Sequence, residues 1–105
     1  MKVAITSTGN SPDSMLDPRF GRCSWFVIYD TETGSTEFIP NPYKNEEEDV
    51  GLAVVNLIIS RQVKKIISGE FGVKVKSLLD RRQVQLILLK ESGFTITKII
   101  ELLNH

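Results

Sequence analysis

The sequence has few of the residues on which catalysis and metal binding most often depend. Its 105 residues include one cysteine, Cys23, and one histidine, His105, at the last position. A single cysteine excludes an internal disulfide. These two residues provide neither a zinc-type spacing nor a convincing pair of nucleophile and base, and no Walker-type glycine loop occurs. These absences argue against an enzyme.

An excess of positive charge and long apolar runs are also missing. Thirteen basic residues balance thirteen acidic ones, so the chain lacks the positive field that general nucleic-acid or anionic-membrane binding needs. The first residues turn polar at Thr6, too early for a signal-peptide core, and no stretch approaches a membrane span. A lone thiol is safest in a reducing compartment. We therefore expect a cytoplasmic protein that binds neither nucleic acid nor membrane.

The composition is that of an ordinary folded protein. Hydrophobic residues make up 41% of the chain and charged residues 25%, close to the globular average. A chain of 105 residues can bury one core but not two. We therefore predict one domain, residues 1–105.

Runs of β-branched and aromatic residues predict five strands, at 2–7, 23–30, 35–39, 64–68 and 84–89. The last of these is continuously apolar, which is typical of a strand buried in a parallel sheet. Apolar residues spaced by three and four predict three helices. The first follows the acidic run 46–49, the second includes Val75, Leu78 and Leu79, and the third follows Thr95, a predicted N-cap, with Phe94 packing against Ile99.

The order of these elements predicts the sheet. The short connection at 31–34 requires an antiparallel hairpin, whereas the two later crossovers, each through a helix, give parallel strands with right-handed connections. The simplest solution is a three-layer α/β fold with a five-stranded mixed sheet in the order 3-2-1-4-5, in which only strand 2 is antiparallel. In that order strands 1 and 4 are neighbours whose connections leave in opposite directions. Such a switch point opens a crevice at the carboxyl ends of the strands, where we expect the ligand.

Two loops are predicted to meet at this crevice, residues 7–22 and 68–72. A structureless loop as long as the first is uncommon unless it has a function. Arg19 and Arg22 lie within four residues of Cys23; guanidinium groups bind anions, and positive charge favours the thiolate. The second loop leads into a helix N-terminus, which attracts anions. The predicted cofactor-binding residues are Ser7, Thr8, Gly9, Arg19, Phe20, Arg22, Cys23, Gly69 and Gly72, with Cys23 as the metal ligand.

Simpler interpretations stand beside these predictions. A free cysteine at a strand start is more often a small buried hydrophobe than a ligand, and the two arginines pair with Asp13, Asp17 or glutamate residues about as readily as with a ligand. The glycines after strand 4 are too few to be a phosphate fingerprint. If the sheet order is right, Cys23 lies at the same edge as Ser7, Thr8 and Gly69. We expect the loop from Gly9 to Pro18 to be poorly ordered without a ligand, because it has few apolar anchors.

A family resemblance rests mainly on the segment 19–23, Arg-Phe-Gly-Arg-Cys, which runs into Phe26, Ile28 and Asp30, with Asn41-Pro42 after strand 3. With its start, Met-Lys-Val-Ala-Ile, the chain resembles the dinitrogenase iron-molybdenum cofactor biosynthesis family, which includes NifX and the C-terminal domain of NifB. The resemblance implies a ribonuclease H-like fold and binding of iron-molybdenum cofactor, or of its iron-sulfur precursors, in nitrogen fixation. The chain departs from the family at 68–73, where Glu70 adds a negative charge to a loop that is usually rich in glycine.

Three functions remain open. The first is a non-enzymatic carrier of an iron-sulfur cluster or iron-molybdenum cofactor precursor, a monomer or weak homodimer that works with cofactor-assembly proteins. One cysteine cannot supply the usual four ligands of a cluster, so the others must come from elsewhere. The second is a regulatory or interaction module that binds a small anion or a partner protein without metal. A nuclease is the weakest, because strand 1 lacks the acids that hold metal ions in ribonuclease H.

Overall fold

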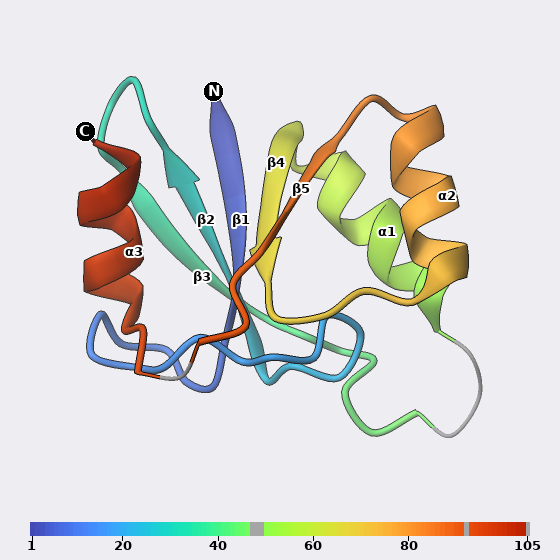
Figure 1. Cartoon of the computed structure of the whole chain (residues 1–105), viewed down its shortest axis with the longest axis horizontal. Helices are drawn as coiled ribbons and strands as arrows, with labels where there is room; N and C mark the ends of the chain where they lie inside the picture. Colours follow the sequence, from blue (N-terminus) through green and yellow to red (C-terminus); the bar gives the residue numbers. More distant parts are fainter. Residues whose placement is uncertain (47–49, 92, 105) are drawn as a thin grey trace.

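The computed structural model of the chain describes residues 1–46, 50–91 and 93–104 (Figure 1). The described residues form five strands and three helices in the predicted order, three strands followed by a helix and then by two strand–helix pairs. The elements are β1 (Lys2–Ser7), β2 (Trp25–Asp30), β3 (Thr36–Pro40), α1 (Gly51–Ser60), β4 (Val63–Ser68), α2 (Val73–Arg81), β5 (Gln85–Leu88) and α3 (Ile96–Leu103). Residues 47–49 of the acidic run, and His105, lie outside the described residues, so the predicted role of that run at the start of α1 is not addressed. The described first turn of α1 carries no acidic residue.

The five strands form one sheet in the order β3-β2-β1-β4-β5, which confirms the predicted order. β2 pairs antiparallel with both β1 and β3, whereas β1 pairs parallel with β4, and β4 with β5. β2 is therefore the only strand that runs against the others. The neighbours β1 and β4 form the switch point that the sequence analysis predicted.

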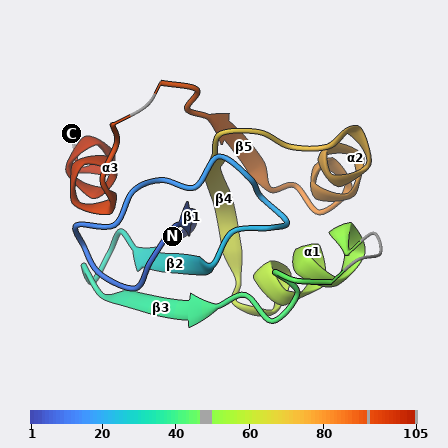
Figure 2. The ribbon, with the colours of Figure 1, turned by 90° about the horizontal axis from the view of Figure 1, so that it is seen from below.

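Helices cover both faces of the sheet, giving three layers (Figures 1 and 2). On one face, α1 and α2 pack over a cluster that includes Ala4, Phe26 and Ile66. On the other face, α3 packs over a second cluster that includes Val3, Ile5 and Val27. The two clusters take alternate residues of β1, as expected of a strand that is buried on both sides.

β5 corrects one prediction. Its apolar run suggested a strand buried on both faces, but β5 is the edge of the sheet, and Leu88 is 40% exposed. The α3 layer lies over the β2 and β3 side (Figure 2), so the outer face of β5 is only half covered. Among the described residues, no helix is long and apolar enough to cross a lipid bilayer.

The parallel strands β1, β4 and β5 end at the same edge of the sheet, the lower edge in Figure 1, which Figure 2 shows face on. Three connections therefore converge there: the β1–β2 loop, the β4–α2 loop and the β5–α3 loop. The last of these ends at Thr95, whose side chain accepts a hydrogen bond from the Lys98 backbone N–H at 3.1 Å. The predicted N-cap of α3 is confirmed, and it fixes one wall of this edge.

Candidate functional site

A crevice of about 540 Å³ opens where the three connections meet. This volume lies within the roughly 300–1,000 Å³ that is usual for small-ligand sites. The lining residues come from all three connections: Met15, Leu16, Pro18, Gly69, Glu70, Leu89, Lys90, Glu91, Gly93 and Phe94. The crevice is therefore at the predicted edge, but the β5–α3 connection, which the sequence analysis did not include, supplies half of its wall.

Buried hydroxyl groups connect the β1–β2 loop to the end of β4, where the two predicted walls of the crevice meet. Thr6 Oγ1, at the end of β1, lies 2.6 Å from the Asp17 carbonyl oxygen and 2.9 Å from Ser68 Oγ. Ser68 Oγ also lies 3.4 Å from the Pro18 carbonyl oxygen. Thr6 and Ser68 are fully buried. Because these bonds are out of water, they fix the β1–β2 loop against the end of β4.

Gly69 lets the two loops approach each other closely. A Cβ atom at this position would lie 2.6 Å from Pro18 Cα and 2.8 Å from Pro18 Cβ, closer than real Cβ contacts occur. Only glycine fits here without a shift of backbone. The predicted site residue Gly69 thus lines the crevice, and it does so by bringing the β4–α2 loop onto Pro18.

The loop from Gly9 to Pro18 is held much more firmly than we expected from its few apolar residues. Its backbone is bonded to the start of α3, with Leu16 N–H donating to the Phe94 carbonyl at 2.9 Å and Ile96 N–H to the Ser14 carbonyl at 2.9 Å. The premise that this loop lacks anchors because it has few apolar residues is therefore wrong. Backbone hydrogen bonds to a distant segment anchor it, and these cannot be recognised in the composition of the loop.

Ser7 and Thr8 shape the start of this loop instead of pointing a free group into the crevice. Ser7 Oγ donates to the Gly9 carbonyl oxygen at 2.7 Å, and the Gly9 backbone N–H donates to Ser7 Oγ at 3.3 Å. Thr8 Oγ1 accepts from Met15 N–H at 3.1 Å, while Thr8 N–H donates to the Met15 carbonyl. A Cβ at Gly9 would lie 2.6 Å from Ser14 Oγ. The three residues therefore form the turn that brings Met15 to the crevice.

Arg19 pairs within the chain. Its backbone N–H lies 3.0 Å, and its Nε 3.3 Å, from Asp17 Oδ1, with Nη2 3.4 Å from Oδ2. The hydrogen bond that Arg19 donates to Asp17, then the charge of Asp17, raises the pKa of Arg19, and Glu70 adds a smaller effect of the same sign. Asp17 is 2% exposed, whereas the Arg19 side chain is 55% exposed. The pairing that the sequence analysis weighed against ligand binding is the one observed.

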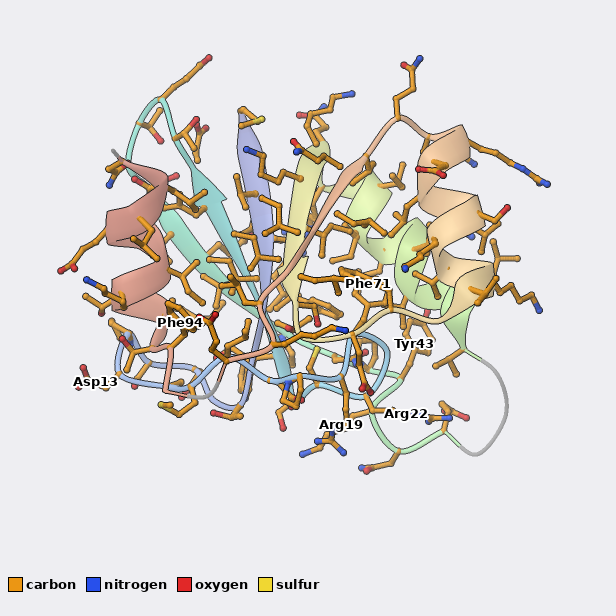
Figure 3. All side chains as sticks on the ribbon, viewed as in Figure 1. Asp13, Arg19, Arg22, Tyr43, Phe71 and Phe94 are labelled. Atoms are coloured by element: carbon orange, nitrogen blue, oxygen red, sulfur yellow. The ribbon has the colours of Figure 1, made fainter. Side chains whose placement is uncertain are left out.

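Arg22, which lies beside Tyr43 in Figure 3, and Phe20 also stabilise the structure of this edge. Arg22 Nη1 donates to the carbonyl oxygens of Tyr43 and Glu46, which ties the loop after β3 to the β1–β2 loop. Phe20 is 3% exposed, and its ring centroid lies 5.3 Å from that of Phe71 and 5.9 Å from that of Phe26. Phe20 is therefore a core residue between the loop and the α1 and α2 layer.

Cys23 lies at the predicted edge, since it precedes Trp25, which pairs with Ser7 at the carboxyl end of β1. Its side chain, however, is fully buried, and Sγ donates to the Phe20 carbonyl at 3.4 Å. Burial, and next the charge of Asp17, raise the pKa of the thiol from 9.0 to about 12. The predicted stabilisation of a thiolate by the arginines is therefore wrong in this state, because Asp17 neutralises Arg19 and water is excluded.

Of the nine predicted residues, the structure brings one, Gly69, into the crevice wall. Gly72 is the exposed N-cap residue of α2, with no atom within 4 Å of a Cβ placed there. In the described part of the chain, no group of three or more His, Cys, Asp or Glu side chains is placed to hold a metal ion. The crevice residues 89–94 of the β5–α3 connection could have been predicted from the strand order. Because β5 is parallel to β1, the loop that follows β5 must lie at the same edge of the sheet as the loop that follows β1.

The fold and the crevice define a class: a small three-layer α/β domain with a crevice at the switch point of a mixed sheet. The chain belongs to the family described as dinitrogenase iron-molybdenum cofactor, whose model matches residues 1–105. This agrees with the resemblance found in the segment 19–23.

Three known proteins are similar to this chain in sequence or in fold. A curated, uncharacterized protein of Methanocaldococcus jannaschii is 35% identical over 80 residues, which are 73% of this chain and 64% of that protein, so the match spans less than two thirds of the relative. The NMR structure of a proposed NifB protein from Thermotoga superposes with a TM-score of 0.82 at 31% identity, covering 97% of this chain and 85% of that one. The apo orange protein of Desulfovibrio gigas has a TM-score of 0.87 at 23% identity, covering 95% and 83%, and so shares the fold.

Proposed function

We propose that this chain is a non-enzymatic carrier of an iron-sulfur cluster or an iron-molybdenum cofactor precursor, which it binds in the crevice between the three loops. The family supports a part in the biosynthesis of the iron-molybdenum cofactor. The observation that carries the proposal is the crevice itself, of about 540 Å³, at the switch point of β1 and β4. Its partners would be the cofactor-assembly proteins that deliver and receive the cargo.

The residues of the crevice suit a cargo that arrives with its own ligands. Five apolar residues, Met15 among them, and two glycines make up most of the wall, and the charged residues are Glu70, Lys90 and Glu91. A rigid edge of this kind fixes the orientation of a preformed cluster through packing and hydrogen bonds. It does not require the chain to complete the coordination of iron, which one cysteine cannot do.

Cys23 remains the one protein ligand to a metal that the sequence predicts. Because Sγ is buried and bonded to the Phe20 carbonyl, the thiol reaches a ligand only if the segment around Phe20 moves. The Arg19–Asp17 pair limits the second predicted contact in the same way, since an anionic cargo must compete with Asp17 for the guanidinium. Contacts from Cys23 and Arg19 to a cargo therefore require the β1–β2 loop to rearrange, whereas the crevice is open without such a change.

Anaerobic titration with an iron-sulfur cluster donor tests the proposal. We expect the wild-type chain to take up the cluster, seen as visible absorption that stays with the protein on gel filtration. Met15→Trp, which fills the crevice, should reduce uptake at least tenfold. Leu52→Trp is the matched control, because Leu52 is also exposed, at 55% against 38%, but lies on α1 and does not line the crevice. No uptake by the wild type, or equal uptake by Met15→Trp, would reject the crevice as the carrier site.

The variant Cys23→Ser decides the role of the thiol in the same titration. Reduced uptake by Cys23→Ser, with unchanged far-UV circular dichroism, assigns the thiol as a ligand. Unchanged uptake by Cys23→Ser would show that the thiol is not a ligand and that the crevice binds the cluster without it.

A further inference from the structure

β5 leaves one edge of the sheet without a partner strand. It ends the order β3-β2-β1-β4-β5, and Figure 2 shows α2 over one of its faces but no helix or strand of the described chain beyond its edge. Leu89 N–H donates to the Ser68 carbonyl oxygen at 2.9 Å, so Leu89 and, by alternation, Ile87 turn their backbone groups toward β4. The backbone N–H and C=O groups of Leu86 and Leu88 therefore turn toward the free edge.

The two edges of the sheet differ in their protection against further pairing. β3, the opposite edge, ends in Pro40, which has no N–H, and carries Glu37, whose carboxylate pairs with Arg61 at 2.9 Å. Proline and charged residues keep other strands from pairing with an edge. Residues 83–89, which include β5, contain neither, and Leu88 is 40% exposed. β5 is therefore the edge that can accept a further strand.

An apolar groove adjoins the β5 edge on the α3 side of the sheet. It has a volume of about 200 Å³ and is lined by Ile67, Ile87, Leu89, Ile99, Leu102 and Leu103. Leu102 is 47% exposed. Because Ile87 lies in the middle of β5 and also lines the groove, a strand paired with β5 would continue the apolar surface of the groove.

The sequence of β5 is complementary to itself in an antiparallel pairing. If Ile87 of two copies lies on a two-fold axis, Leu86 of each copy is opposite Leu88 of the other. Both of these leucines turn their backbone groups to the free edge, so they form hydrogen-bonded pairs. In the same register Gln85 is opposite Leu89. Every opposed pair within the strand is therefore uncharged.

Charges beside the strand favour the antiparallel direction. Arg81 and Arg82 precede β5, whereas Lys90 and Glu91 follow it. An antiparallel pairing brings the two arginines of one copy to the end of the other that has the carboxylate. A parallel pairing would bring the arginines of both copies together, which is unfavourable.

We propose that β5 binds β5 of a second copy of this chain, antiparallel about Ile87, so that the two sheets continue into one. The crevices of the two copies then lie at opposite edges of the joined sheet. A pairing through so short a strand buries little area, so the dimer is weak and dissociates below about 0.1–1 mM.

Disulfide formation locates the two-fold axis. In a Cys23→Ala background, Ile87→Cys places two thiols opposite each other, in a non-hydrogen-bonded pair with Cα atoms about 4.5 Å apart, which suits a disulfide. Gln85→Cys in the same background is the matched control, because it lies on the same face but its two copies are about 13 Å apart along the strands. On oxidation we expect Ile87→Cys to form a linked dimer at least tenfold faster. Equal rates, or faster linking of Gln85→Cys, would overturn the register.

Sedimentation equilibrium from about 0.01 to 1 mM measures the association itself. Leu88→Pro removes an N–H that faces the free edge and keeps the bonds to β4, so association should weaken at least tenfold. Leu88→Lys, which keeps the N–H but adds a charge, should weaken it as well if Leu88→Pro does not fold. Thr36→Pro is the matched control, because Asp30 N–H donates to the Ser35 carbonyl oxygen and Thr36 therefore faces outward at the β3 edge. A monomeric wild type throughout this range, or folded Leu88 variants that associate like the wild type, would overturn the proposal and leave the β5 edge to a strand of another protein.

Discussion

The carboxyl edge of the sheet has two halves that use similar residue types for different purposes. The closed half lies toward α1 and α2 and contains Phe20, Cys23 and Phe71, all packed against the core. The open half lies between the β1–β2 loop and the β5–α3 loop and contains the crevice. The residues that stand out in the sequence belong to the closed half, whereas the space for a ligand is in the open half. Distinctive residues can therefore build the frame of a site without touching what the site binds.

The largest expected effect breaks the closed half. Phe20→Ala removes a ring that is 3% exposed and packs against two other rings, so we expect the free energy of unfolding to fall by about 3–5 kcal/mol. Met15→Ala, in the open half, removes a side chain that is 38% exposed and should cost less than about 1 kcal/mol. Urea denaturation followed by circular dichroism measures both. Similar losses for the two variants would contradict the division of the edge.

The arrangement of strands was predictable because it depends on local patterns and a few topological rules. Alternating and β-branched runs located β1, β2 and β4, and the short connection before β3 required an antiparallel pair. The predicted strand order places β5 at the edge of the sheet, but its partial exposure was not predictable from its apolar run, because exposure depends on how far the α3 layer extends over the sheet. A continuous apolar run is typical of a strand that is buried on both faces, but it also occurs in a strand with one face only partly covered.

The site was predictable in place but not in detail. The switch point required only the strand order, whereas the state of Cys23 and Arg19 depended on a third residue, Asp17, being buried beside them. The backbone bonds from Leu16 and Ser14 to the segment 94–96 join positions about 80 residues apart. Such pairings cannot be recognised from residue types that are close in sequence. The Cys23 thiol and the Arg19 guanidinium were therefore predicted to contact a ligand, whereas in the fold they are bonded to Phe20 and Asp17.

The second prediction sharpens the contrast at Cys23. Its thiol is protonated in the folded chain up to about pH 12, whereas in the unfolded chain it ionises near its usual pKa of 9.0. The unfolded state therefore binds fewer protons above pH 9, and the free energy of unfolding falls as pH rises from about 9 to 12, by up to about 1.4 kcal/mol per pH unit. Below pH 9 the two states bind the same number of protons at Cys23, and the contribution is constant.

Denaturation curves of the wild type and Cys23→Ala at pH 8, 9, 10 and 11 measure this contribution. Lysine and tyrosine ionisation affects both proteins, so the difference between their slopes isolates Cys23. We expect the wild type to lose about 2 kcal/mol more than Cys23→Ala between pH 9 and 11. Parallel curves would mean that the thiol is accessible to water, which would move Cys23 from the closed half to the open one.

The smallest expected effect tests the boundary between the halves, where Gly69 meets Pro18. Gly69→Ala places a Cβ 2.6 Å from Pro18 Cα, so the β4–α2 loop must shift, which we expect to cost about 1–2 kcal/mol and to weaken cluster uptake by deforming the crevice wall. Gly72→Ala is the matched control, because its Cβ meets nothing within 4 Å and its φ of −70° suits any residue. Unfolding and cluster uptake measured together separate the two consequences. If Gly69→Ala lost stability but kept full uptake, the crevice would not depend on this close approach, and the frame and the site would be independent.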